Sequence, residues 1–184
     1  MEFEQVVAQR RAVREFHDAP VERPLIERLI ATATLAPSAM NLQPWSFAVI
    51  TGTRRIDACA ERAREHALSQ TGIIDARARQ LLSDPSASIF HHAPALLLVL
   101  ANANEAQARE DCCLAALTFM LAARDAGLGT CWIGFGRPWL DLPETRAELG
   151  LPLQRHVVAP IVFGYPRIWP AAHARHAAQI HWIG

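Results

Sequence analysis

Two apolar segments in the middle of the chain constrain the fold most strongly. Residues 95–100 read Ala-Leu-Leu-Leu-Val-Leu without a polar interruption. An apolar run of this length is typical of a strand that is buried on both faces. Residues 105–126 follow as a helical segment, and within it the run 112–123 has only Thr118 as a polar residue. Such a helix is apolar all round and is expected at the centre of a protein, and the run is too short to cross a bilayer.

Helices and strands alternate along the rest of the chain. Helices are predicted over 3–10, over 25–33 with Pro24 at a first helical position, and as two charged, Ala-rich segments within 53–82 separated by Gly72. Gly127 is expected to end the long helix, because Gly accepts the left-handed conformation there. Further strands are predicted over 45–51, 130–135, 157–163 and 179–183. Pro160 indicates a bulge or an edge location for the third of these.

The composition favours one globular domain spanning residues 1–184. The 18 basic residues are all Arg and are balanced by 18 acidic residues, which gives no support for a nucleic-acid partner. The four cysteines form no Cys-x-x-Cys pair, which fits a reduced, cytoplasmic protein. The first residues lack the apolar core of a signal peptide, and no membrane partner is expected.

A segment rich in turn residues carries two side-chain amides. Residues 36–45 read Ala-Pro-Ser-Ala-Met-Asn-Leu-Gln-Pro-Trp. In an extended segment Asn41 and Gln43 point to the same side, and each offers donors and an acceptor. Such a pair suits the edge of a flat, polar heterocycle. Alternatively, Asn41 bonds its own backbone in a turn and Gln43 is a surface residue.

A compact cationic cluster precedes this segment. Arg10, Arg11 and Arg14 lie within five residues, and Arg10 and Arg14 share a face if the preceding helix continues between them. Two such side chains give charge-assisted hydrogen bonds to a phosphate, although an isolated cluster of this kind is more often a solvated basic turn. A segment for a ring and a segment for a phosphate together indicate a nucleotide-like cofactor.

Three blocks together resemble the FMN-dependent nitroreductase family. They are residues 10–16, 36–45 and 127–134, they occur in the family's order, and the resemblance extends from about Arg10 to Trp182. It implies an α+β, nitroreductase-like sandwich with a central, mostly antiparallel sheet flanked by helices. It also implies an intertwined homodimer with shared active sites, in which residues 112–123 lie at the centre of the interface.

The same resemblance assigns the cofactor FMN and its contacts. The phosphate and ribityl end of FMN is expected to be bound by Arg10, Arg11, Ala12 and Arg14, with only a backbone contact from Ala12. Contact with the flavin ring, from the partner subunit, falls to Pro37, Ser38, Ala39 and Asn41, with Gln43 beside them. The backbone of Cys131, Trp132, Ile133 and Gly134 is expected near the reactive flavin nitrogen, where an N–H stabilises developing negative charge. The alternative interpretation is that Trp132 is an ordinary packing residue of a buried strand.

Two positions implied by the family are harder to assign. A basic residue of the tail is expected to close over the phosphate, and Arg175 is the first choice, with Arg167 and His173 as alternatives. Arg77 and Arg79 are candidates for the pyrimidine edge of the flavin. A metal site at His173, His176 and His181 is a further alternative, but no carboxylate or Cys accompanies these residues.

The activity implied by the resemblance is an NAD(P)H-dependent oxidoreductase that passes a hydride through FMN to a small-molecule acceptor such as a nitroarene or quinone. No Ser-His-Asp set, carboxylate pair or P-loop is present, so no side chain is expected to act as a catalytic acid or base, since the cofactor carries the chemistry. The alternatives are flavin reduction, dehydrogenation of a metabolite, oxidative fragmentation of the flavin, or an FMN-binding dimer without turnover.

Overall fold

The core of the fold is an antiparallel sheet. The computed structural model describes residues 1–70, 75–84 and 86–184. Within them four strands pair in the order β1-β2-β4-β3, and all three pairings are antiparallel. The strands are β1 (Trp45–Thr51), β2 (Ala95–Ala101), β3 (Gly129–Trp132) and β4 (His156–Gly164). The predicted α+β class with an antiparallel sheet is confirmed.

Strand β2 divides the core into two layers. Every one of its residues is buried. Leu96, Leu98 and Leu100 pack with the helices on one face, and Leu97 and Val99 pack on the other. Successive side chains of a strand point to opposite faces. The uninterrupted apolar run therefore supplies both halves of the core, as predicted.

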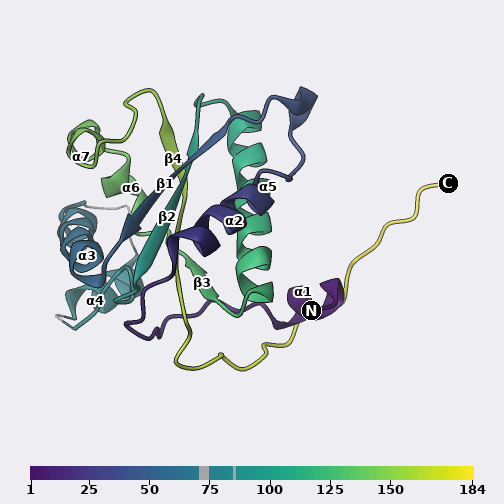
Figure 1. Ribbon diagram of the computed structural model, residues 1–184, viewed down its shortest axis with the longest axis horizontal. Coiled ribbons are helices and arrows are strands. Elements are labelled where there is room, and N and C mark those ends of the chain that lie inside the picture. Colours follow the sequence, from purple (N-terminus) through teal and green to yellow (C-terminus); the bar gives the residue numbers. More distant parts are fainter. Residues whose placement is uncertain (71–74, 85) are drawn as a thin grey trace.

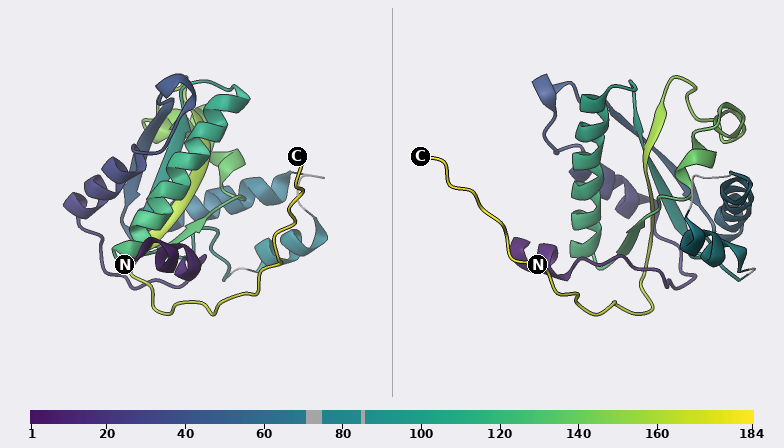
Figure 2. Two further views of the ribbon diagram at one scale, coloured as in Figure 1. Left: turned by 90° about the vertical axis from the view of Figure 1, so that its right-hand side faces the viewer. Right: turned by 180° about the vertical axis from the view of Figure 1, so that it is seen from behind.

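Helices cover both faces of the sheet (Figures 1 and 2). One layer contains α2 (Arg23–Ala33) and the long helix α5 (Ala106–Asp125), with α1 (Phe3–Gln9) beside the end of α5. The other contains α3 (Thr53–Ser69), α4 (Ala76–Ser83), α6 (Arg137–Leu140) and α7 (Pro143–Glu148). Helix α5 ends as predicted, because Gly127 adopts φ 80° and the Leu128 N–H reaches back to the Ala123 carbonyl at 2.8 Å. Gly72 lies outside the described residues.

Pro160 lies in an internal strand and not at the edge of the sheet. The pairing of β4 with β2 shifts register, so that Ala159 pairs with Val99 and Val157 with Leu100. Val158 is the extra residue of a bulge next to this shift. The prediction of a bulge was therefore correct and that of an edge location was wrong. Pro160 remains compatible with the sheet because it lies opposite Ile133, just beyond the end of β3.

The predicted strand over residues 179–183 is wrong. This segment has no regular structure, and Trp182 and Ile183 are 89% and 98% exposed. The tail leaves the sheet after β4 and extends away from the body of the molecule (Figure 1), and among the described residues no strand pairs with it. The short helices α6 and α7 were not predicted. No helix in the described part of the chain is long and apolar enough to cross a membrane.

Candidate functional site

The arginine cluster lies on an extended segment and not on a helix. Helix α1 ends at Gln9, and Arg10 has extended dihedral angles, φ −61° and ψ 130°. The segment then runs beside the edge strand β3: Ala12 bridges Thr130 in a parallel sense, and the Val13 N–H donates to the Thr130 carbonyl at 2.9 Å. The preceding helix therefore does not continue between Arg10 and Arg14, so a shared helical face is ruled out. Positions four apart also share a side in an extended chain.

Two of the three arginines lie near Cys131 in the edge strand β3. Burial raises the pKa of the Cys131 thiol, and the nearby Arg14 and Arg10 guanidinium groups oppose that rise. The Arg11 side chain folds back, and its Nη1 donates to the Ala8 and Arg10 carbonyls at 2.6 and 2.7 Å. The structure therefore brings Arg10 and Arg14 together with Cys131, while the Arg11 guanidinium binds its own backbone.

The residues after β3 open onto a cavity. The Ile133 N–H donates to the Pro160 carbonyl at 2.8 Å, so this N–H is engaged in the sheet. Because neighbouring residues of a strand direct their backbone N–H and C=O groups to opposite sides, those of Trp132 point away from β4. At Gly134 an added Cβ would have no heavy atom within 4 Å, so a ligand can approach the backbone closely there. Of the four predicted residues, Trp132 and Gly134 have the orientation needed to face a ligand with their backbone.

The cavity has a volume of about 1110 Å³, slightly above the usual range for small-molecule sites. It lies between the end of β3, helix α4 and the segment that precedes β2. Arg14, Cys131, Trp132, Ile133 and Gly134 all line it. Arg77 also lines it, whereas the Arg79 guanidinium donates to the Leu68 and Gln70 carbonyls at 3.0 and 3.1 Å. Arg77 is thus the better placed of the two predicted pyrimidine-edge candidates.

His91 is a cavity residue that sequence reasoning missed. It and His92 have φ values of 54° and 50°, a left-handed conformation that costs of order 1 kcal/mol or more for each non-Gly residue and often marks functional sites. Burial, together with the charges of Arg14 and His92, lowers the pKa of His91 to about 4. The imidazole is therefore neutral near pH 7 and can donate from one nitrogen and accept at the other. In the sequence, the only signal that could have indicated a site residue here is the pair of adjacent histidines before β2.

The amide segment is ordered but differs from the prediction. Residues Ala39–Asn41 form a short 3-10 turn, and Met40, Asn41 and Gln43 all have positive φ, between 46° and 55°. The Gln43 side-chain amide donates to the Asn41 side-chain oxygen Oδ1 at 3.1 Å, and the Gln43 backbone N–H donates to the Ser38 hydroxyl at 3.0 Å. The two amides are thus adjacent, through a left-handed turn and not through an extended strand.

This segment lies at the far end of the molecule from α4 and the cavity. Figures 1 and 2 show the turn beyond the N-terminal end of α5, with α4 at the opposite end of the sheet. One chain therefore does not bring Pro37, Ser38, Ala39, Asn41 and Gln43 to the Arg10–Arg14 segment.

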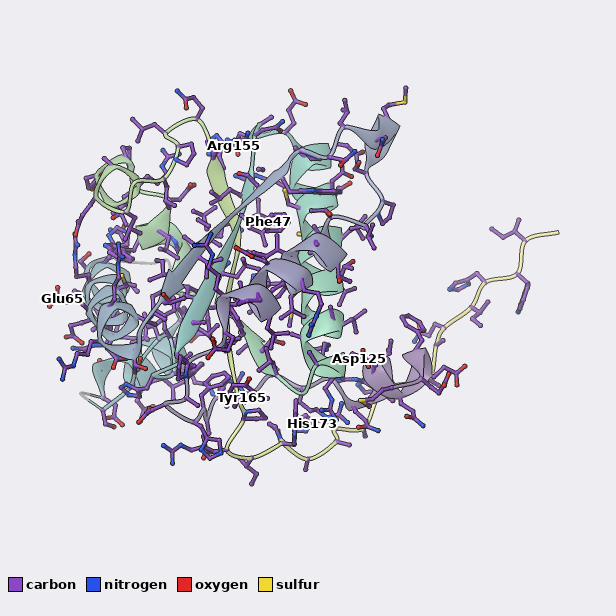
Figure 3. The ribbon with its side chains drawn as sticks, in the orientation of Figure 1. Phe47, Glu65, Asp125, Arg155, Tyr165 and His173 are labelled. Atoms are coloured by element: carbon purple, nitrogen blue, oxygen red, sulfur yellow. The ribbon has the colours of Figure 1, made fainter. Side chains whose placement is uncertain are left out.

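The tail begins beside the arginine segment. The Arg167 backbone N–H donates to the Glu15 carbonyl at 2.9 Å, and its Nε donates to the Phe16 carbonyl at 2.7 Å. Further along, the tail runs past His173 and away from the sheet (Figure 3). Arg175 forms no hydrogen bond or ion pair with the arginine segment among the described residues. No group of three or more metal-ligating side chains gathers in the described ranges.

Comparisons with known proteins identify relatives of this chain and of its fold. The family model described as Nitroreductase family matches residues 7–165. The 5,6-dimethylbenzimidazole synthase of Rhodospirillum rubrum is 34% identical over 177 residues, which cover 86% of this chain and 79% of that protein. The 4-nitrobenzoate reductase of Nocardioides sp. is 28% identical, with 89% of this chain and 80% of that protein covered. A nitroreductase of Bacteroides fragilis, whose crystal structure contains bound FMN, has the same fold: the TM-score is 0.87 at 24% identity, and the match covers 100% of both chains.

Proposed function

The chain belongs to the Nitroreductase family, and on this basis we propose that it is an FMN-dependent oxidoreductase that uses NAD(P)H to reduce a nitroaromatic, quinone or similar acceptor. The observation that carries the proposal is one large cavity lined by Arg14 and the end of β3, with Arg10 close to Cys131 in its wall. The FMN bound by the Bacteroides fragilis neighbour and the nitroaromatic substrate in the name of the Nocardioides relative support the same function.

The residues at the cavity fit FMN. Arg10 and Arg14 would hold the phosphate, because two guanidinium groups give it charge-assisted hydrogen bonds. The backbone at Trp132 and Gly134 would face the ring, and Arg77 its pyrimidine edge. Once bound, FMN supplies the redox chemistry, which alternates between reduction by NAD(P)H and reoxidation by the acceptor. The buried Cys131 thiol, with its raised pKa, stays protonated and packs the wall.

The complete site requires a second copy of the chain. The amide segment lies far from the cavity of its own chain and presents Met40 and Leu42, which are 91% and 69% exposed. Helix α5 buries one face against the sheet and exposes Leu114 and Leu117, which are 42% and 46% accessible. Pairing of these apolar surfaces in a homodimer would bury them and would bring Asn41 of the partner subunit to the flavin. The exposed tail would add further contacts.

Flavin occupancy of an arginine variant tests this assignment. Arg10→Ala combined with Arg14→Ala should remove FMN while the protein stays folded, because each lost charged hydrogen bond costs about 1.5–3 kcal/mol, a tenfold or greater loss of affinity. The exposed pair Arg28→Ala and Arg54→Ala is the matched control, with expected wild-type occupancy. Unchanged FMN binding in the cavity variant would refute the phosphate assignment.

Oxidative fragmentation of the flavin is the second candidate function. The 34% identity to a 5,6-dimethylbenzimidazole synthase favours it, since the dimethylbenzene ring of that product is also part of the flavin. In that case NADH or NADPH would fail to reduce the bound FMN anaerobically. The flavin would instead be consumed in oxygen once it had been reduced chemically. Mass spectrometry of the released product distinguishes the two functions.

A further inference from the structure

Helix α5 carries a buried carboxylate that holds the amide segment. Asp111 is 3% exposed, and both of its carboxylate oxygens accept from the Ala39 backbone N–H, at 3.3 and 3.2 Å. The Gln107 side-chain amide, one turn earlier on the same helix, donates to Oδ1 at 3.0 Å. Both donors are neutral, and among the described residues no cation forms an ion pair with Asp111.

Stability alone does not explain a charge at this position. Burying a carboxylate without a cation is unfavourable, and an apolar residue of similar volume is often as stable or more so. What the carboxylate gains is a charge-assisted contact of both oxygens with one backbone N–H of a distant segment. That N–H belongs to the first residue of the left-handed turn.

The turn that Asp111 holds is strained, ordered and exposed. Met40, Asn41 and Gln43 adopt positive φ, which non-Gly residues keep only where their surroundings hold them. Ser38 and Gln43 close the turn by the hydrogen bond from the Gln43 N–H to the Ser38 hydroxyl. Asn41 and Gln43 are nevertheless exposed. A turn held in an unfavourable conformation with exposed amides is organised in advance for a contact outside its own chain.

We infer that Asp111 is a positioning residue for the flavin-contacting turn, which its hydrogen bonds to Ala39 clamp in the left-handed conformation that presents Asn41 to the ring. This role rests on the proposed function. Asp111 does not touch the cofactor. It acts through Ala39, so its loss changes how tightly and in what environment FMN is held, more than it changes whether the chain folds.

Substitutions at Asp111 separate this role from a structural one. Asp111→Ala removes both acceptor oxygens, and Asp111→Asn keeps one of them at nearly unchanged volume. The neighbouring Glu110 is exposed on the same helix, so Glu110→Asn is a control for the loss of one negative charge. The measurements are the dissociation constant of FMN, the visible circular dichroism of the bound flavin, and hydrogen exchange at the Ala39 amide without FMN.

We expect Asp111→Ala to weaken FMN binding at least tenfold, to alter the circular dichroism of the flavin and to accelerate exchange at Ala39. Asp111→Asn should recover part of each effect, and Glu110→Asn should match the wild type. If the Ala variant does not fold, the Asn variant decides by the same three measurements. A folded variant with wild-type affinity and spectrum would overturn the role of Asp111 alone. Wild-type protein that takes up no FMN would instead overturn the proposed function.

Discussion

Two glycines at the two ends of the segment 129–134 give a sharp test of how the arginine segment is held. A Cβ at Gly129 would meet three carbon atoms of the Val13 side chain at 2.7–2.8 Å, closer than van der Waals contact allows. Val13 is fully buried and β-branched, so it cannot rotate out of the way. The strain of Gly129→Ala must therefore displace the segment that carries Arg10 and Arg14. Overpacking of this kind costs about 1–3 kcal/mol.

Gly134→Ala is the matched control, because its Cβ would enter open space and should change the unfolding free energy by less than about 0.5 kcal/mol. Urea unfolding of both variants without FMN measures this difference, and FMN titration measures the consequence. We expect Gly129→Ala to lose stability and affinity together. Gly134→Ala should keep its stability but weaken FMN binding, because the methyl group blocks close approach. A Gly129→Ala variant with wild-type stability and affinity would refute the docking of the arginine segment on β3.

Three further predictions follow from single side chains. His91→Gln should make the unfolding free energy less sensitive to acid. Because the pKa of His91 falls from 6.5 to about 4 on folding, the wild-type protein loses up to about 3 kcal/mol of unfolding free energy as the pH falls from 6.5 to 4. Parallel plots of unfolding free energy against pH for the two proteins would contradict this. Leu117→Asp should give a folded monomer in analytical ultracentrifugation, with weakened FMN binding in a titration. Leu153→Asp, at another exposed leucine, should sediment as the wild type does. Equal behaviour of the two variants would argue against α5 as the interface. Arg146→Ala should cost about 2–3 kcal/mol in thermal unfolding, because the buried guanidinium donates to two backbone carbonyls at 2.8 and 2.6 Å, and a wild-type melting temperature would show that these bonds contribute nothing.

Local patterns were sufficient for the sheet and the larger helices. The apolar run of β2 and the all-apolar half of α5 predicted burial because hydrophobic periodicity reflects which faces are covered. The same reasoning failed at residues 179–183. An apolar, β-prone segment needs a strand to pair with, and the pattern does not say whether one lies within reach. The exposure of Trp182 and Ile183 in the single chain is the result.

The site depended on contacts between distant parts of the chain. The sequence left both an extended segment and a turn open for Asn41, and a hydrogen bond from Ala39 to Asp111, 72 residues away, helps to hold the turn left-handed. His91 acquires its low pKa because folding buries it and brings Arg14 beside it. Arg77 and Arg79 are equivalent as sequence and differ only because the Arg79 guanidinium binds two carbonyls. Long-range polar contacts of this kind leave no local pattern.

The most direct test of the central claim is the visible spectrum of the purified, FMN-loaded protein before and after anaerobic addition of NADH or NADPH. We predict flavin bands that bleach with one of the two nucleotides and return when a nitroarene or a quinone is added. Bands that persist with both nucleotides would contradict the NAD(P)H-dependent activity and would favour fragmentation of the flavin. A protein that stays colourless after incubation with FMN would contradict the assignment of the cavity.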